Sequence, residues 1–318
     1  MVPEPLSVLY VAGSGRSGST LLDLLLGSLP GVVSLGEFHR LWHVMWEQNR
    51  FCGCGEPLQD CTVWRAVVGK TLGGFDGVDW RRYMGSEDQL LLQRRLLELR
   101  FPRLLGRRRR EELDEVMAVR ARLYREAALR AGATMVVDSS KRPSYALALR
   151  RAAGLDVRVV HLLRDSRPVA HSWSTPKPHP RPGKPESMMR RIGPQRMAIA
   201  WDVEQLACEA FVRPALPTLR VYYEDLARKP EQTVRRVLRF AGRPDLGSSF
   251  SLDNIAPFQH HTIGGNPIRF EKGPLTVQLD ERWRQDMPAG ERRAVTALTW
   301  PLLAAYGYMS LWRRRNGR

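Results

Sequence analysis

A glycine-rich loop, residues Gly13–Thr20, constrains the fold of this chain more than any other feature of its sequence. Val8–Ala12, before the loop, is apolar throughout and predicts a short buried strand. Thr20–Leu29, after the loop, is mostly leucine and predicts a helix that ends at Pro30. A strand, a glycine loop and a helix open an α/β nucleotide-binding unit, in which loop amides and the helix N-terminus face one anion. The sequence therefore predicts an anion site close to its start.

The same alternation of strand and helix recurs along the chain. Further elements are predicted as strands at Met135–Val137, Val157–Leu163 and Leu219–Tyr223 and as helices at Ser144–Ala153 and Glu231–Phe240. Strands that alternate with helices are typical of a parallel sheet. We therefore predict an α/β protein with a P-loop-like three-layer fold and a central, mostly parallel sheet, in which residues 1–318 form a single domain.

A long charged segment separates the first strand unit from the second. Ser86–Leu105 and Glu111–Ala131 both carry apolar residues at helical spacing, with breaks at Pro102 and Gly106. We predict a helical insertion at about residues 80–131 that packs beside the sheet.

The glycine loop has the spacing of a Walker A sequence, with Gly13, Gly18 and a hydroxyl residue at Thr20. Ser19, however, stands where an NTPase places its lysine, and Arg16 lies inside the loop. This composition suits a phosphosulfate, which has no γ-phosphate and needs no magnesium clamp. A P-loop kinase or NTPase, the alternative, would need the missing lysine and an acidic residue for magnesium, a role into which Asp138 could be forced.

Two motifs resemble the donor site of sulfotransferases that use 3′-phosphoadenosine-5′-phosphosulfate (PAPS). Arg16–Leu22 resembles their 5′-phosphosulfate loop, and this arginine form, with Gly36 and Glu37 downstream, is most similar to the tyrosylprotein and Golgi-type branch and to many bacterial members. Val159–Trp173 resembles the 3′-phosphate motif, a strand that ends in Arg164 followed by a serine on the next helix, here Ser172. An arginine at the carboxyl end of such a strand faces the ligand crevice, and its planar fork suits phosphate.

Two weaker matches extend the resemblance. Val221–Leu226 resembles a strand end whose tyrosine, here Tyr223, approaches the nucleotide, and Gly265–Gly273 resembles a basic loop that closes over PAPS. Either Arg269 or Lys272 could make the contact from that loop. The resemblance thus implies a donor site formed by Gly15, Arg16, Ser17, Gly18, Ser19, Thr20, Arg164, Ser172, Tyr223 and Arg269 or Lys272.

The resemblance also implies the reaction, the transfer of a sulfuryl group from PAPS to a hydroxyl of a small-molecule or glycan acceptor without a metal. Glu37 is our prediction for the general base, because it follows Arg16 at the separation found in tyrosylprotein-type enzymes. His39 is the competing base, since the cytosolic phenol and steroid enzymes use histidine, and Glu37 could instead be a surface or capping carboxylate. Arg16 and Lys141 are predicted to stabilise the leaving group, although Lys141 or Arg142 could merely cap the sheet edge.

Three cysteines, Cys52, Cys54 and Cys61, resemble part of a zinc site. A closed structural site needs four ligands, and the sequence offers His39, His43 or Cys208 as the fourth without selecting one. Reduced thiols in a loop and a disulfide are the alternatives, and the predicted chemistry itself uses no metal.

Composition limits the possible partners. The chain has 50 Lys and Arg against 33 Asp and Glu, a net charge of +17, which favours anionic partners. The runs Arg107–Arg110 and Arg313–Arg315 are typical of solvated surface, and scattered arginines do not predict a nucleic-acid partner, so a non-catalytic nucleic-acid-binding protein is a minor alternative. No apolar stretch reaches about 18 residues and the start lacks a basic leader, so we expect a cytoplasmic protein with no transmembrane segment.

The acceptor itself is not identified by the sequence. Trp42 and Trp46 lie four residues apart and share a helix face, where they could line an acceptor pocket or, more commonly, form core. The helical insertion and the proline-rich loop Thr175–Pro185 are the other candidate walls. The sequence likewise does not predict an oligomeric state.

Overall fold

The computed structural model describes residues 4–248, 250–255, 259–270, 275 and 277–309, so Lys272 and Arg313–Arg315 lie outside the described residues. Five strands form one parallel sheet in the order β2-β3-β1-β4-β5, which is the predicted fold class. The strands are β1 (Leu6–Gly13), β2 (Val32–Gly36), β3 (Met135–Lys141), β4 (Leu155–Leu163) and β5 (Thr218–Tyr222).

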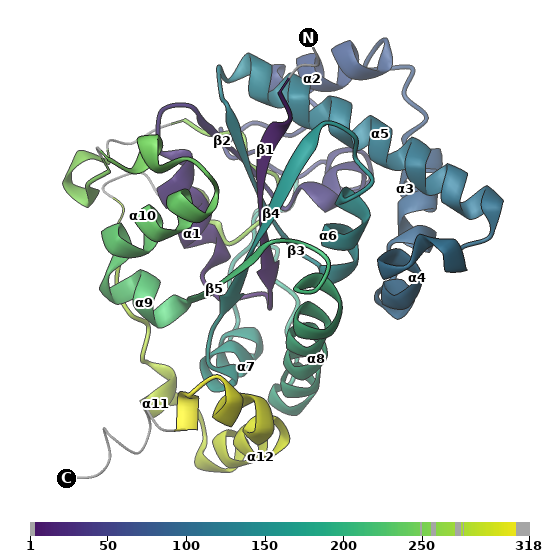
Figure 1. Ribbon diagram of the computed structural model, residues 1–318. Helices are drawn as coiled ribbons and strands as arrows, with labels where there is room; N and C mark the ends of the chain where they lie inside the picture. The colour runs from purple at the N-terminus through teal and green to yellow at the C-terminus, as the bar shows by residue number, and fades with distance from the viewer. Residues whose placement is uncertain (1–3, 249, 256–258, 271–274, 276, 310–318) are drawn as a thin grey trace.

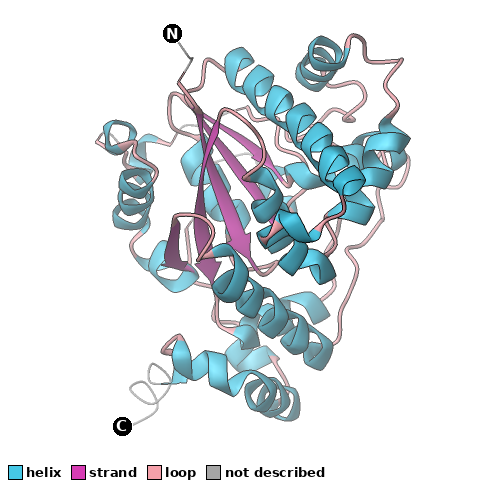
Figure 2. Ribbon diagram, turned by 45° about the vertical axis from the view of Figure 1, so that its right-hand side comes forward, coloured by secondary structure: helices cyan, strands magenta, loops and turns pink. Residues whose placement is uncertain are grey.

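The sheet is buried on both faces. Val8 and Tyr10 of β1 belong to one apolar cluster, whereas Leu9 and Val11 between them belong to another, as the alternation of side chains along a strand requires. In Figure 1 one face is covered by α1 (Ser19–Gly27), α9 (Tyr223–Arg228) and α10 (Pro230–Phe240) and the other by α5 (Arg107–Arg130), α6 (Pro143–Leu149) and α8 (Pro194–Ala207). The result is the predicted three-layer arrangement, which Figure 2 shows from a second direction.

The predicted insertion lies between β2 and β3 and is helical. Its helices are α2 (Thr62–Leu72), α3 (Trp80–Leu90), α4 (Leu96–Arg100) and α5, joined by the 3-10 turns η3 (Gln93–Arg95) and η4 (Pro102–Leu104). Within Ser86–Leu105, where apolar residues recur at helical spacing, the structure has more than one helix, because α3 ends at Leu90. There the carbonyl of Leu91 accepts a hydrogen bond from Ser144 Oγ (2.7 Å), and Pro102 ends the next helical segment.

A buried ion pair holds the insertion together. Arg120 of α5 is fully buried, and its Nε lies 2.6 Å from Glu87 Oε1 of α3. Arg120 also donates to the backbone carbonyls of Phe38 (2.9 Å) and His39 (3.2 Å), and Trp42 Nε1 donates to Glu87 (3.0 Å). The insertion is therefore fastened to the segment that follows Glu37. Trp42 is core, as the commoner interpretation of the tryptophan pair had it.

The C-terminal part lies at the lower end of the sheet in Figure 1, and its apolar cluster includes the buried Trp201. Its remaining α-helices are α7 (Ser166–Ser174), α11 (Trp283–Asp286) and α12 (Ala289–Ala305). The other short helices are η1 (Phe38–Arg40), η2 (His43–Glu47), η5 (Cys208–Val212), η6 (Pro244–Gly247), η7 (Leu252–Asn254) and η8 (Pro267–Phe270). Over the described residues, no helix has the length and apolarity needed to cross a membrane.

Candidate functional site

A cavity of about 730 Å³ lies at the loop between β1 and α1. In the sheet, β2 and β3 lie on one side of β1, and β4 and β5, which follow later in the chain, lie on the other side. The order of the strands therefore reverses at β1, and the loop after β1 lies at the switch point of the sheet. Open α/β sheets bind ligands at such a point, beyond the carboxyl ends of their strands. The predicted residues that line the cavity are Gly15, Arg16, Gly18, Ser19, Thr20, Glu37, Lys141, Arg164, Ser172 and Tyr223.

The loop conformation depends on glycine at Gly18. Its φ of 86° is left-handed, and a Cβ there would lie 2.4 Å from the ring of Tyr223. Arg16 has a φ of 69° although it is not glycine, and so does Lys141. A left-handed φ costs an ordinary residue about 1–3 kcal/mol, and such strain gathers at functional sites.

Several buried polar atoms around the loop have no hydrogen-bond partner among the described residues. Among them are Arg16 Nη1, Ser17 Oγ and Arg164 Nε. A buried donor without a partner is costly, at about 1–3 kcal/mol, so such atoms at a loop of backbone amides fit an anion. Ser17 itself is buried behind the surface of the cavity rather than lining it.

Arg164, at the end of β4, is held in place from several sides. Its Nη1 donates to the carbonyl of Arg16 (2.9 Å), its Nη2 lies 3.6 Å from Asp280 Oδ2, and its guanidinium stacks over Tyr223 at 4.2 Å. Ser172, in the last turn of α7, accepts a hydrogen bond from Lys177 Nζ (3.0 Å). The two motifs that the sequence places about 150 residues apart therefore meet at one end of the cavity.

Glu37 and Lys141 form an ion pair on another wall of the cavity. Lys141 Nζ lies 2.8 Å from Glu37 Oε1 and donates to the Ser139 carbonyl at the same distance. Burial raises the pKa of Glu37, but the charges of Lys141 and Arg40 outweigh burial and lower this pKa to about 2. Glu37 is therefore a carboxylate at neutral pH, the form that a general base requires.

Two other titratable groups line the same cavity. Burial, followed by the charges of Arg142 and Arg40, lowers the pKa of His39 well below its usual range, so this imidazole is neutral. Burial raises the pKa of Glu204, in α8, to about 7. Glu204 was not predicted, because a lone glutamate on a helix carries no sequence signal.

Arg269 does not line the cavity. Its Nη1 donates to the Thr262 carbonyl (2.5 Å) and its Nη2 to the Phe51 carbonyl (2.7 Å), so it braces the loop on which it lies. Asn266, from the same loop, reaches the phosphate loop instead, since its backbone N–H donates to Thr20 Oγ1 (3.2 Å). The alternative contact, Lys272, is outside the described residues.

Lys177 and Arg282 are basic residues of the cavity that sequence reasoning missed. Lys177 comes from the proline-rich loop that was predicted as a candidate acceptor wall, yet its amine reaches Ser172. Burial, followed by the charge of Arg16, lowers the pKa of Lys177 to about 8. Its position five residues after Ser172 was the available signal.

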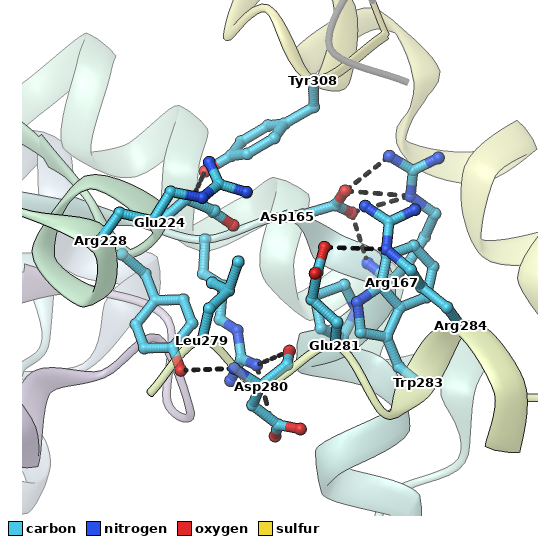
Figure 3. A pocket seen from close by; sticks show the side chains of 13 residues that line it. Asp165, Arg167, Glu224, Arg228, Leu279, Asp280, Glu281, Trp283, Arg284 and Tyr308 are labelled. Carbon is cyan, nitrogen blue, oxygen red and sulfur yellow. Dashed lines mark hydrogen bonds and ion pairs between the residues drawn. The ribbon is translucent and has the colours of Figure 1, made fainter. Parts of the chain in front are cut away.

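A smaller cavity of about 190 Å³ lies on the other side of Arg164 and Tyr223. Figure 3 shows two ion pairs among the charged side chains that line it, Asp165 with Arg167 and Glu281 with Arg284. Because these charges are satisfied internally, this cavity supports Arg164 from behind and offers less to an anion than the larger one.

The cysteines converge with a histidine that sequence reasoning did not select. The ligand atoms of Cys52, Cys54, Cys61 and His261 all lie within 4.8 Å of one another. The three predicted candidates for a fourth ligand are wrong. His39 lines the cavity, His43 pairs with Glu47 and Asp88, and Cys208 lies beside His161.

A model of the sulfotransferase family matches residues 9–246. No curated protein sequence matches this chain.

Several solved structures are similar to the chain. The sulfotransferase domain from the curacin biosynthetic pathway is 18% identical, with 93% of this chain and 98% of that chain covered and a TM-score of 0.49. The sulfotransferase domain of the Synechococcus PCC 7002 olefin synthase is 16% identical, with 95% and 96% covered and a TM-score of 0.43. Retinol dehydratase in complex with retinol and PAP is 13% identical, with 95% and 82% covered and a TM-score of 0.35.

Proposed function

Because the chain belongs to the sulfotransferase family, we propose that it transfers a sulfuryl group from PAPS to a hydroxyl of a small-molecule or glycan acceptor. The observation that carries this proposal is that the phosphate loop, Arg164 and Ser172 meet in one cavity with Glu37 and Lys141. Backbone amides, basic side chains and a carboxylate base are the groups that such a transfer needs.

The residues present fit the proposed donor. The loop amides and Arg16 would hold the 5′-phosphosulfate, while Arg164, Ser172 and Lys177 would hold the 3′-phosphate. The unpartnered atoms Arg16 Nη1 and Arg164 Nε support this assignment, because each is a buried cationic donor aimed at no acceptor among the described residues. PAPS, when bound, supplies the sulfuryl group and a phosphate leaving group.

Glu37 would act as the general base. Its Oε atoms face the cavity as a carboxylate and would take the proton of the acceptor hydroxyl, which is a poor nucleophile until a base accepts that proton. The pair with Lys141 makes Glu37 a weak base. An anion bound at the loop would offset the charge of Lys141, so the pKa of Glu37 should rise toward its usual range and the base would gain strength once the donor site is filled.

Lys141 and Arg16 would stabilise the leaving group. Both are cations on the cavity wall, and both have a left-handed φ, which indicates that the fold holds them against a local preference. Preorganised cations at the site of developing charge lower a barrier most when they need no reorganisation.

The wall beyond Glu37 favours a polar acceptor. His39, Arg40, Gln93 and Arg142 line this part of the cavity, and Arg40 Nη1 lies 3.7 Å from Glu37 Oε2. Basic and amide side chains recognise hydroxyl-rich or anionic molecules better than apolar ones, so a glycan or a polar small molecule is the better candidate.

Calorimetric titration with 3′-phosphoadenosine-5′-phosphate, alongside ATP with magnesium, tests the donor. We expect the bisphosphate to bind more tightly than ATP, and Arg164→Ala to weaken it by about 10–100-fold through loss of charge-assisted hydrogen bonds. The matched control is Arg82→Gln, an arginine 59% exposed on the insertion, which should bind normally. Preference for ATP with magnesium would instead favour a kinase-like reaction. Asp138 would then have to leave the buried hydrogen bond it accepts from Tyr124.

A further inference from the structure

The four ligand atoms near Cys61 have the spacing of a tetrahedral metal site. Cys54 Sγ and Cys61 Sγ are 3.9 Å apart, and His261 Nδ1 lies 3.7 Å from Cys52 Sγ and 3.3 Å from Cys61 Sγ. A tetrahedral zinc ion with ordinary bond lengths places two sulfur atoms about 3.8 Å apart and a sulfur and a nitrogen about 3.5 Å apart. The observed separations lie on either side of these values, so one ion fits among the four atoms.

The chemistry of the ligands selects the metal. Three thiolates and one imidazole form a common structural zinc set, and soft thiolate ligands disfavour magnesium and calcium. Cys52 and Cys61 are buried, as suits a closed structural site. A disulfide between Cys54 and Cys61 does not fit the geometry, because their sulfur atoms are nearly twice as far apart as the roughly 2.0 Å of an S–S bond.

The cysteine loop and the histidine come from distant parts of the chain and touch closely. Gly53 N donates to the Thr262 carbonyl (3.1 Å), and Trp64 Nε1 donates to the His261 carbonyl (2.7 Å). A Cβ on Gly53 would lie 2.1 Å from His260 Nδ1, so only glycine allows this approach. A metal here would join residues about 200 positions apart along the chain.

The segment after His261 leads directly to the proposed active site. Ile263 N donates to the Leu35 carbonyl (2.8 Å), and the Ile263 carbonyl accepts from Glu37 N (2.5 Å), so Ile263 pairs with the end of β2 at the proposed base. Three residues later Asn266 N reaches Thr20 Oγ1 of the phosphate loop. A bond that holds His261 in place therefore also restrains Ile263 and Asn266, the residues that contact Glu37 and Thr20 of the cavity.

We propose that Cys52, Cys54, Cys61 and His261 bind one structural zinc ion, and that this ion fastens the segment 261–266 against Glu37 and Thr20. The ion takes no part in the transfer reaction. Its role is to hold a segment that has no helix or strand of its own before Pro267. The presence of the ion does not rest on the proposed function. Only the consequence of the ion for catalysis, through the position of Glu37, rests on the proposed function.

Metal analysis of the full chain, purified under reducing conditions, tests the ion. We expect about one zinc per chain, and a loss of about tenfold or more in His261→Ala, which keeps the backbone carbonyl that Trp64 uses. Cys54→Ser, at a less buried ligand, is a second variant should the first fold poorly. Cys208→Ser is the matched control, since Cys208 is a buried cysteine outside the cluster and should leave the zinc content unchanged.

Hydrogen exchange of the wild-type chain, before and after chelation, tests the fastening. Removal of zinc should speed exchange at the amides of Glu37 and Ile263, and exchange across α12 should stay the same. Absence of bound metal, or a count of two free thiols in place of four in the denatured chain, would overturn the proposal. Bound zinc whose removal leaves these two amides unchanged would overturn the fastening. Failure to bind the bisphosphate with zinc still present would count against the proposed function alone.

Discussion

The part of the cavity that we propose binds the donor's phosphates, here called the phosphate side, and the insertion beside it are built in opposite ways. On the phosphate side, each group of contacts comes from one short stretch of chain, Arg16–Thr20 after β1 and Arg164–Ser172 after β4. In the insertion, α3 and α5 are joined by contacts between residues about 30 positions apart, of which Glu87 with Arg120 is buried and Arg82 with Glu115 is exposed.

The difference teaches which parts of a site a sequence reveals. A strand end followed by a helix places residues that are adjacent in the sequence at one crevice, so a short motif is enough to predict the site. A buried ion pair between helices depends on how those helices pack, and neither partner is marked by its neighbours. The two kinds of region should therefore respond differently to substitution.

Arg120→Met should produce the largest effect, and it should be on stability. The substitution leaves the Glu87 carboxylate buried without its partner, which costs about 3–5 kcal/mol in the free energy of unfolding. Urea denaturation followed by circular dichroism measures this loss. Because Arg120 also holds the carbonyls of Phe38 and His39, turnover should fall as well.

Arg82→Gln is the matched control for that prediction, since it breaks an ion pair between the same two helices. Arg82 and Glu115 are 59% and 51% exposed, so we expect a loss of only about 0–1 kcal/mol. Adding Glu87→Gln to Arg120→Met should recover part of the stability. Similar losses in the two single variants would show that burial does not distinguish these pairs.

Glu37→Gln should produce the next largest effect, on catalysis alone. Glutamine keeps the size of the side chain but accepts no proton, so turnover should fall by about 10²-fold or more while bisphosphate affinity stays nearly the same. Steady-state rates and calorimetry measure the two quantities.

Glu204→Gln is the control for the base, because Glu204 lines the same cavity and has a pKa raised to about 7. We expect its turnover to fall by less than about tenfold. A larger loss in Glu204→Gln than in Glu37→Gln would make Glu204 the base, and an equal loss of bisphosphate affinity in Glu37→Gln would make Glu37 structural.

The parallel sheet and the phosphate side were predictable from sequence because their signals are local. Strands that are apolar on both faces predict the sheet, and the loop with Arg16 and the strand ending in Arg164 predict where the crevice lies. Ten of the predicted residues line one cavity, while their roles in the reaction stay predictions.

The rest depended on contacts that the sequence does not mark. His261 joins Cys61 across about 200 residues, and no spacing links a histidine to a cysteine at that separation. Where α3 ends, the Leu91 carbonyl accepts a hydrogen bond from Ser144, a residue of another helix. Arg269 was one of two candidates for the donor site because of its position in a basic loop, but it does not line the cavity, and its two terminal nitrogens donate to backbone carbonyls.

Loss of the charge of Lys177 should produce the smallest effect. It is also the sharpest test of the phosphate side, because Lys177 lies in the proline-rich loop Thr175–Pro185 and not in either of the two sequence motifs. Its pKa is lowered to about 8, so the amine is charged below that pH and loses its charge as the pH rises through it. A charged amine beside Ser172 attracts the bisphosphate and a neutral one does not. Bisphosphate affinity should therefore fall above pH 8, by up to about tenfold.

Calorimetry from pH 7 to 9.5 distinguishes the charge of Lys177 from its packing. Lys177→Arg keeps a cation at every pH in this range and should bind with little change in affinity across it. Lys177→Met removes the cation, so its affinity should be low and equally independent of pH. If Lys177→Met keeps the fall above pH 8, another group titrates there, and the phosphate side consists of its two sequence motifs alone. If the fall disappears, the phosphate side depends on a residue that packing supplies, as the insertion does, and the contrast between the two regions is one of degree.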